Sequence, residues 1–274
     1  MNNMKRKNVL NTLSISILFF ILLSFSVSLS AQEQLAKIKQ KGELRVGLTD
    51  TQPPYAMQSK DSTIIGFEAD IAQIIADRMG VKLVMVPLNF SELLSSLKEG
   101  EIDLIMSGMT MSTERNMEVA FIGPYHNAGK SILTFAQVYA DAESPDELNK
   151  GSVKIAALKG STSEEFIVNN MPKAKLISTN DYEEAIDLLN NDKVGLVVAE
   201  KSIIRFTMMQ YPESGYVTLD DPFNYEPIGM GVMPNDVLLI NLLQNIISEL
   251  IESGEINEIE NSWFWDDEWI EKVN

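Results

Sequence analysis

The chain has 274 residues, of which 45% are hydrophobic and 22% charged, a globular composition that excludes an intrinsically disordered protein. Its 22 basic and 39 acidic residues give a formal net charge of −17, which makes nucleic acid and anionic lipid poor partners. It contains no cysteine, which excludes disulfides, thiolate chemistry and lipid attachment at an N-terminal cysteine.

Residues 1–30 differ from the rest of the chain. A basic start, Lys5–Lys7, precedes an apolar stretch that ends in small residues. This pattern predicts a cleaved secretory signal peptide, with cleavage after Ser30 or after Ala31. A retained membrane anchor is the alternative, because the stretch is long enough to span a bilayer. The leader holds three basic and no acidic residues, so the remaining chain has a net charge of −20. We therefore expect a soluble, unlipidated protein in a bacterial periplasm.

The mature chain alternates apolar strand patterns with amphipathic helix patterns. The first set predicts strands at 43–49, 81–88 and 102–108 and helices at 66–80 and 90–100. We expect Ser91 to cap the start of the second helix, and Gly80 and Gly100 to end the two helices. This alternation predicts α/β layers with a largely parallel sheet.

A second set of the same kind begins near residue 152. It predicts strands at 153–160, 174–180 and 193–202 and helices at 161–171 and 181–192. In both sets an apolar strand ends in polar residues, at the edge where open α/β sheets bind ligands. Two lobes on one plan, facing each other through such edges, would enclose a cleft.

The segments from Glu43 to Phe264 resemble the bacterial periplasmic solute-binding proteins of family 3, which serve polar-amino-acid ABC importers. Five segments carry the resemblance in order: "LRVGLTDTQPPYAM", "GFEADIAQIIADRMG", "SGMTMSTERNMEVAFIGPY", "KGSTSEEF" and "ESGEINEIENSWF". The resemblance implies an α/β, two-lobed periplasmic-binding-protein fold (type II), with two Rossmann-like lobes joined by two hinge strands. These hinge strands are expected near 132–137 and 224–229. Lobe 1 would comprise residues 31–137 and 226–274, and lobe 2 residues 138–225. The lobes are expected to be open without ligand and to close on it.

The resemblance also implies how the carboxylate of an amino acid is held. Arg115 would bind it through a planar guanidinium, helped by Thr110. Gly108 would let the backbone approach closely and present its carbonyl to the ligand ammonium. From the second lobe, Ser161 and Thr162 would contribute from the start of a helix, where free N–H groups bind anions. Taken singly, Arg115 would suit a surface salt bridge, and Ser161–Thr162 would suit simple helix capping.

The ligand ammonium needs an anion, and the resemblance places Glu200 there, where relatives usually carry Asp. A solvated carboxylate is the alternative. Gln52, Tyr55 and Phe90 are candidates for the ligand side-chain pocket, although the two aromatic residues suit ordinary core packing equally well. His126, the only histidine, is expected to be exposed and makes no metal site, and we expect no cofactor.

Three functions remain open. The first is a monomeric binding protein that delivers an amino acid to a membrane ABC permease through transient contact, without catalysis. The second is a sensory or accessory binding protein with the same cleft. The third is an exported dehydratase acting on cyclohexadienyl acids, which would need a positioned acid or base. Glu200 is the one candidate for that role that the sequence offers, without a visible second partner.

Overall fold

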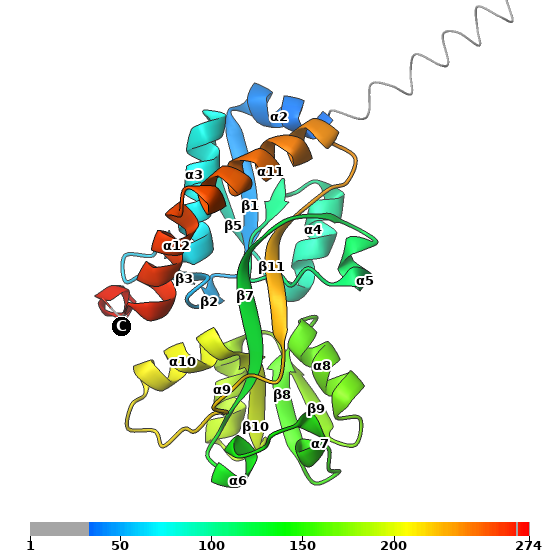
Figure 1. Ribbon diagram of the computed structural model, residues 1–274, viewed down its shortest axis with the longest axis vertical. Helices are drawn as coiled ribbons and strands as arrows, with labels where there is room; N and C mark the ends of the chain where they lie inside the picture. The colour runs from blue at the N-terminus through cyan, green and yellow to red at the C-terminus, as the bar shows by residue number, and fades with distance from the viewer. Residues whose placement is uncertain (1–32, 267, 274) are drawn as a thin grey trace, which may run out of the picture.

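The computed structural model describes residues 33–266 and 268–273. Two lobes are stacked along the long axis of the molecule and are joined by two long strands, β7 (Ala120–Thr134) and β11 (Tyr225–Val232) (Figure 1). Their strands form one sheet in the order β5-β1-β6-β11-β7-β10-β8-β9. The predicted signal peptide lies outside the described residues.

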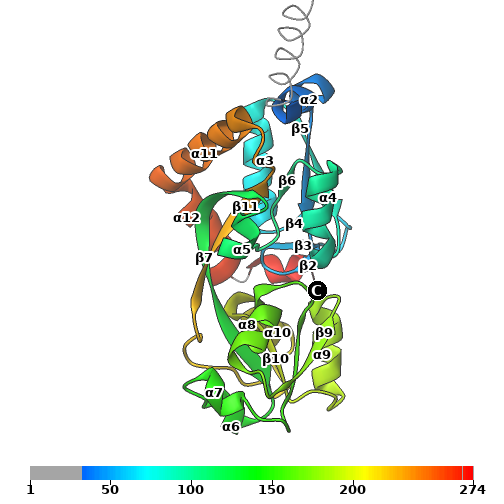
Figure 2. The same ribbon diagram turned by 90° about the vertical axis from the view of Figure 1, so that its right-hand side faces the viewer.

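The upper lobe in Figure 1 contains the first set of predicted elements. Strand β1 pairs in parallel with both β5 and β6, as expected from the alternation of strands and helices. Figure 2 shows α11 and α12 on one side of this lobe and α4 on the opposite side. Its elements are α2 (Glu33–Lys41), β1 (Glu43–Leu48), α3 (Phe67–Met79), β5 (Lys82–Pro87), α4 (Leu93–Glu99), β6 (Leu104–Ile105), α11 (Val237–Glu252) and α12 (Glu255–Glu260).

The helix ends of this lobe follow the sequence in part. Gly80 and Gly100 terminate α3 and α4 in the left-handed conformation, as predicted, and each donates its N–H to carbonyls of the last turn. The prediction that Ser91 caps α4 is wrong. A 3₁₀ turn, η2 (Phe90–Glu92), precedes the helix, so the capping box forms between Asn89 and Glu92 instead.

The lower lobe contains the second set, with β8 parallel to both β9 and β10. Its core is built from alternate buried residues of these strands, among them Ile155, Ala157, Leu196 and Val198. Its elements are α6 (Gln137–Ala140), α7 (Pro145–Leu148), β8 (Lys154–Leu158), α8 (Thr162–Asn170), β9 (Lys175–Thr179), α9 (Tyr182–Asn190), β10 (Leu196–Glu200) and α10 (Lys201–Gln210).

The two connecting strands run antiparallel to each other, from Val232 opposite Ala120 to Tyr225 opposite Gly129. Strand β7 then continues into the lower lobe and pairs with β10, with Lys130 opposite Glu200. The range 132–137 expected for the first hinge covers only the end of β7. The strand crosses the junction between the lobes upstream of that range, so residues 128–130 and 224–226 lie beside the cleft.

Three smaller features border the junction of the lobes. The first is a small sheet in the order β2-β3-β4, made of β2 (Thr51–Gln52), β3 (Ala56–Gln58) and β4 (Ile64–Ile65), and the second is the short helix α5 (Thr113–Asn116). The third is the C-terminal segment, η3 (Asn261–Trp265) and η4 (Glu268–Lys272). It contacts lobe 2, because Arg205 on α10 donates to the Phe264 carbonyl and Phe206 stacks on Trp269.

Within the described residues, no single helix is long and apolar enough to cross a membrane. One bent pair, Val237–Glu252 with Glu255–Trp265, meets the length and composition criteria together, with a bend of 74°.

Candidate functional site

Arg115 is buried between the lobes, with 5% of its surface exposed. It lies on α5, whose N-cap Ser112 accepts the Arg115 backbone N–H. Its guanidinium donates to the carbonyls of Thr110 in its own loop, at 3.2 Å, and of Gly160 across the cleft, at 2.9 Å, and it lies 5.6 Å from the centre of the Phe90 ring. Among the described residues, no carboxylate lies within ion-pair distance of it. Arg115 therefore does not form the surface salt bridge that would be expected of this residue taken singly.

A buried guanidinium without a bonded carboxylate is costly, because carbonyl oxygens offset only part of the lost hydration. Burial lowers the pKa of Arg115 from its usual value, while the carboxylates of Glu165, Glu226 and Glu200 act in the opposite direction from further away. The group stays charged at neutral pH, since arginine is protonated far above it. It therefore provides a positive centre suited to an anion in the cleft.

Gly108 sits where only a residue without a side chain fits. Its φ is +56°, and an added Cβ would lie 2.8 Å from the Gln52 side-chain nitrogen and 3.2 Å from the Tyr55 ring. Its N–H donates to Glu68 on α3 at 2.6 Å. Gly108 is thus fixed close to the lobe 1 wall, although its own N–H is already bonded.

The buried Glu68 carboxylate holds the loop that contains Gly108. Its second carboxylate oxygen accepts from the Tyr125 hydroxyl at 2.5 Å. Burial raises the pKa of Glu68 to about 7, even though the hydrogen bonds from Tyr125 and Gly108 act to lower it. The carboxylate therefore titrates near neutral pH and links α3, β7 and the Gly108 loop.

Thr110 and Thr162, the two hydroxyls expected to meet a ligand carboxylate, do meet across the cleft. Their oxygens are 3.0 Å apart. Both also donate to one oxygen of Glu226 on β11, at 2.8 Å from Thr110 and 2.6 Å from Thr162. Burial by itself would raise the pKa of Glu226, but Lys130 and these hydroxyls outweigh it, so the pKa lies below the usual value.

Glu200 is buried at the end of β10 and is not solvated. One of its oxygens lies 2.5 Å from Nζ of Lys130, and the other accepts from the Tyr182 hydroxyl at 2.8 Å. Lys130 has no exposed surface and also lies 3.1 Å from Glu226. Three adjacent strands thus present a row of alternating charge, with Glu200 on β10, Lys130 on β7 and Glu226 on β11.

Ser161 serves the helix, as the capping interpretation expects. Its hydroxyl donates to the Leu158 carbonyl at 2.6 Å and accepts the Glu164 N–H at 3.2 Å, which makes it the N-cap of α8. Its neighbour Thr162 instead points its hydroxyl at the cleft residues Thr110 and Glu226. A role for Ser161 toward a ligand stays a prediction.

The three candidates for a side-chain pocket are all buried in lobe 1. Gln52 accepts from Ser107 at 3.2 Å, and Tyr55 packs edge-on against Phe264 and His126. Phe90 lies under the Arg115 guanidinium. Burial, together with the charge of Glu200, raises the pKa of Tyr55 well above its usual value, so Tyr55 stays neutral in this core.

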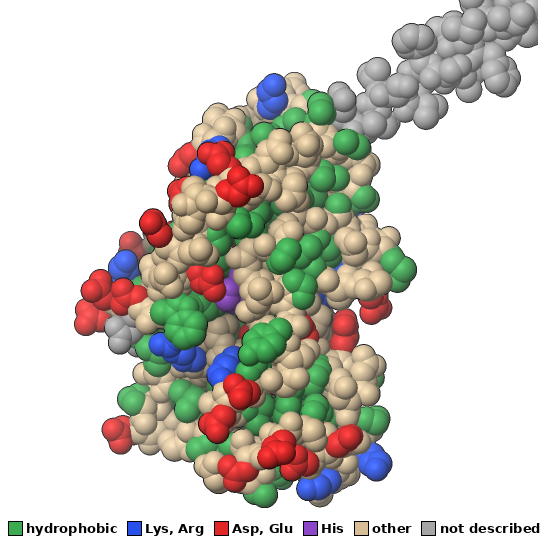
Figure 3. Space-filling view, in the orientation of Figure 1, with side chains coloured by type: hydrophobic (Ala, Val, Ile, Leu, Met, Phe, Trp, Pro, Cys, Tyr) green, Lys and Arg blue, Asp and Glu red, His purple; other side chains and the backbone are tan. Residues whose placement is uncertain are grey.

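His126 is not the exposed loop residue expected from the sequence. It lies on β7 with 8% of its side chain exposed, stacks on Phe264 with 4.3 Å between ring centres, and contacts Glu260. Figure 3 shows the histidine in purple, in a hollow between the two lobes. It thus contacts α12 through Glu260 and η3 through Phe264.

Sequence reasoning missed four residues of the site: Glu68, Lys130, Tyr182 and Glu226. Lys130 carried a signal, because "AGKSIL" puts a lysine inside an otherwise small and apolar strand. Charged residues are almost never fully buried unless they are paired, so such a lysine indicates an acidic partner. Glu226 and Tyr182 gave no comparable signal, since neither interrupts a run of small and apolar residues.

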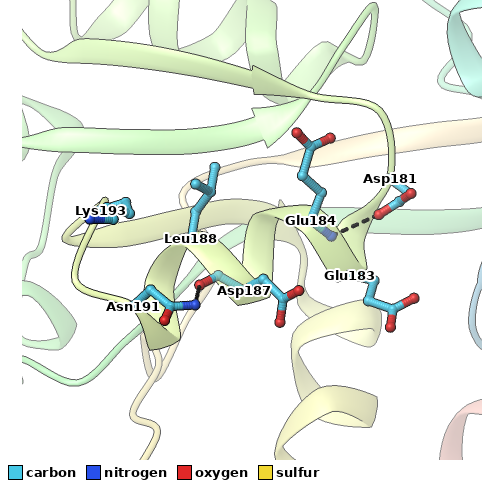
Figure 4. A pocket seen from close by; sticks show the side chains of 7 residues that line it. All are labelled: Asp181, Glu183, Glu184, Asp187, Leu188, Asn191 and Lys193. Carbon is cyan, nitrogen blue, oxygen red and sulfur yellow. Dashed lines mark hydrogen bonds between the residues drawn. The ribbon is translucent and has the colours of Figure 1, made fainter.

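Two cavities lie near these residues. One, of about 490 Å³, lies between the Asp50–Gln58 region of lobe 1 and helices α9 and α10 of lobe 2, and reaches Tyr182. The other, of about 430 Å³, follows α9 and contains none of the predicted site residues (Figure 4). Four of its seven lining side chains are acidic, and Asp181 among them caps α9. The first cavity is lined by both lobes, and so is a further cavity of about 310 Å³, whose lining includes Gly129, Lys201 and Tyr225.

The geometry defines a two-lobed α/β ligand-binding protein with a charged site between the lobes. Residues 44–266 match the model of the bacterial extracellular solute-binding proteins, family 3. The chain belongs to this family.

Individual relatives divide into two kinds. The chain is 26% identical to a cyclohexadienyl dehydratase of Pseudomonas aeruginosa, over 87% of this chain and 89% of the relative. It is 25% identical to ABC transporter arginine-binding protein 1 of Escherichia coli, over 90% and 98%. Most of the relatives are amino-acid-binding proteins of ABC transporters.

A solved structure shares the whole architecture. The putative binding component of an ABC transporter from Wolinella succinogenes, complexed with lysine, superposes with a TM-score of 0.80 at 32% identity. The match covers 85% of this chain and all of the other. It confirms the expected two-lobed fold.

Proposed function

We propose that the protein binds a small amino acid, or a related zwitterion, between its lobes outside the cytoplasm and delivers it to an ABC-type importer. The observation that carries this proposal is Arg115, a guanidinium buried at the lobe junction with carbonyl partners and no bonded carboxylate among the described residues. A ligand carboxylate would supply two parallel charge-assisted hydrogen bonds there.

The surroundings of Arg115 support an anion at the same place. Thr110 and Thr162 converge on a single carboxylate oxygen, that of Glu226, so their hydroxyls are already oriented to donate to an anion. Thr162 is the first residue of α8, where the helix dipole also favours negative charge. Because Gly108 has no side chain, its backbone can lie close to Gln52 and Tyr55 in lobe 1.

The charge of the cleft suits a zwitterion. Arg115 and Lys130 are balanced by Glu200 and Glu226, so the four groups have no net charge. A carboxylate has about four acceptor positions, and Glu200 uses one for Lys130 and one for Tyr182. The remaining positions leave Glu200 able to accept a ligand ammonium.

We place the ligand side chain toward the cavity that adjoins Tyr182, between the Asp50–Gln58 region and α9 and α10. Gln52, Tyr55 and Phe90 would form the lobe 1 wall behind it. The names of relatives include arginine, cystine and glutamine as ligands.

The remaining expectations belong to the same proposal. The leader would be cleaved to release a periplasmic monomer without catalytic activity, with lobe 1 at residues 31–137 and 226–274 and lobe 2 at 138–225. The permease would be met only transiently. Family membership supports an extracytoplasmic location.

A thermal-shift screen of the chain from Gln32 against the twenty amino acids and small carboxylic acids tests the proposal, because a ligand that binds only the folded state raises the melting temperature. We expect one chemical class of amino acid to raise it. If none does, while the acids without an amino group do, the protein binds carboxylates and not amino acids.

A second candidate is a dehydratase, favoured by the likeness to cyclohexadienyl dehydratase and by the buried Glu200–Lys130 pair. Elimination of water needs a proton donor to the departing hydroxyl. Both oxygens of Glu200 accept hydrogen bonds, one from Lys130 and one from Tyr182, so neither is placed to donate to a substrate hydroxyl. Lys130 would then be the group that carries the proton.

Incubation of the protein with a hydroxylated cyclohexadienyl acid, monitored by ultraviolet absorbance, separates the two candidates. We expect the rate of aromatic product formation to equal that of the buffer blank. Formation of product that is lost in Lys130→Met would move the function to the dehydratase.

A further inference from the structure

The Glu226 carboxylate is bound by the same hydroxyl groups that we expect to bind a ligand carboxylate. Its Oε2 accepts from one hydroxyl of each lobe, Thr110 and Thr162, and lies 3.1 Å from the Lys130 ammonium. Its Oε1 accepts from the Asn224 amide at 3.0 Å. The Glu226 carboxylate therefore has four donors around it. Two of these donors are the Thr110 and Thr162 hydroxyls, which would also donate to a ligand carboxylate.

Lys130 stands in the same way where the ammonium of a zwitterionic ligand would bind. Its ammonium forms an ion pair with Glu200, the group expected to bind a ligand ammonium. The register of the sheet produces this arrangement. Lys130 stands directly opposite Glu200 on β10, while Glu226 stands opposite Ala128, two residues along the same face of β7. The chain thus places its own carboxylate and its own ammonium at both ends of the candidate site.

We propose that Glu226 is an internal latch: a hinge-strand carboxylate that holds Thr110 of lobe 1 to Thr162 of lobe 2 and that an incoming ligand carboxylate must displace. The part of this proposal that concerns ligand rests on the proposed function, whereas the part that concerns the contact between the lobes does not. Glu226 then sets two properties, the population of closed molecules without ligand and the apparent affinity for ligand.

The charge balance explains why the latch can be released. When Glu226 leaves the two hydroxyls, Lys130 keeps its closer partner Glu200, so no buried ammonium is left unpaired. The Glu226 side chain keeps 13% of its surface exposed and stands at the start of β11, next to the exposed Tyr225. A change of side-chain rotamer can therefore bring its carboxylate into solvent.

Glu226→Gln is the variant that tests the latch. It keeps the size of the side chain but removes the charge that Thr110, Thr162 and Lys130 share. The chain has no cysteine, so spin labels at Glu99→Cys in lobe 1 and Val168→Cys in lobe 2, both exposed positions, report the distance between the lobes. Asp221→Asn removes an exposed acid five residues earlier and serves as the matched control.

Without any added amino acid, we expect the label distance to lengthen in Glu226→Gln and to stay at the wild-type value in Asp221→Asn. Glu226→Asp, whose arm is one methylene shorter, should lengthen it as well, which guards against a variant that merely misfolds. A wild-type distance distribution in both Glu226 variants would overturn the latch.

Affinity provides the second measurement, with L-arginine, L-glutamine and L-lysine as probes in calorimetric titrations. For any probe that binds wild type, we expect Glu226→Gln to bind about tenfold more tightly, because a competing closed state has been removed. Equal or weaker binding would overturn the displacement step. If none of the twenty amino acids binds in the thermal-shift screen but the lobes still separate in the variant, the latch stands and the proposed function fails.

Discussion

The buried Arg115 guanidinium donates to two backbone carbonyls, those of Thr110 and Gly160. A carbonyl dipole stabilises a guanidinium less than a carboxylate does, so the site has unused capacity to bind an anion. The guanidinium carbon lies over the Phe90 ring, 5.6 Å from its centre. The residue is therefore where we expect the largest loss of affinity on substitution.

Arg115→Ala should weaken binding of the amino acid by about 3 kcal/mol or more, roughly a hundredfold in Kd, because a desolvated carboxylate loses its partner. Arg115→Lys should restore only part of this, since an ammonium cannot donate in parallel. Titration calorimetry measures both. Arg78→Ala, on the surface of lobe 1, is the control, and unchanged affinity in Arg115→Ala would refute the assignment.

Glu200 tests the other end of the ligand. Glu200→Gln should weaken binding of an α-amino acid by about 2 kcal/mol or more, because the buried ammonium loses its counter-charge. Glu200→Asp, which keeps the charge, should lose less or prefer another ligand. The des-amino analogue of the ligand should bind wild type poorly, and Glu200→Gln should discriminate against it less. Equal binding of both compounds to wild type would exclude Glu200 as the ammonium partner.

Glu68 predicts a pH dependence of stability. Its pKa is about 7 in the folded protein, against an ordinary value of 4.5, so the folded state binds the proton more strongly than the unfolded state. Stability contributed through this group is therefore present below pH 4.5 and is lost as the pH rises through 7. The difference amounts to about 3 kcal/mol at most.

Urea denaturation at pH 5 and pH 8 checks this prediction. Relative to wild type, Glu68→Gln should gain stability on going from pH 5 to pH 8, because its side chain has no charge to bury. Exposed Glu99→Gln should show no such gain. A pH-independent difference between Glu68→Gln and wild type would mean that Glu68 stays in one protonation state throughout.

At the scale of single elements, α8 separates two roles that its first residues could share. Ser161 caps the helix, whereas Thr162 donates across the cleft. Ser161→Ala should cost about 1 kcal/mol of unfolding free energy and leave affinity nearly unchanged. Thr162→Val should weaken ligand binding with a smaller effect on stability. Chemical denaturation and titration of each variant give both quantities, and a large affinity loss in Ser161→Ala would return Ser161 to the ligand site.

Local patterns predicted the elements well, because hydrophobic periodicity and glycine stops depend on nearby residues. Gly80 and Gly100 end their helices as expected. The cap at Asn89 was missed because an additional 3₁₀ turn moved the start of the helix. The "SGMTMSTER" loop likewise holds Gly108, Thr110 and Arg115 together, since all three are close in sequence.

The row Glu200–Lys130–Glu226 could not be predicted in the same way. It depends on the register of β7 against two strands that lie 70 and 96 residues further along the chain. A shift of one residue in either pairing would turn Lys130 to the other face of the sheet. The lysine in "AGKSIL" indicated a buried partner, but the identity of that partner required the fold.

At the scale of the whole molecule, the site exists only because two lobes meet. Arg115 and Thr110 come from one lobe, Thr162 and Glu200 from the other, and Lys130 and Glu226 from the strands that connect them. Closure can therefore be driven by a ligand that contacts all three groups. The C-terminal segment provides a second contact between the lobes, because Arg205 on α10 donates to the Phe264 carbonyl.

Native mass spectrometry of the chain from Gln32, mixed with equimolar amounts of the twenty amino acids, tests the central claim most directly. The account predicts a one-to-one complex whose released ligand has the mass of an added amino acid, chemically intact after long incubation, and no such complex in Arg115→Ala. A protein that retains no amino acid, or that releases a compound of a different mass, would contradict it.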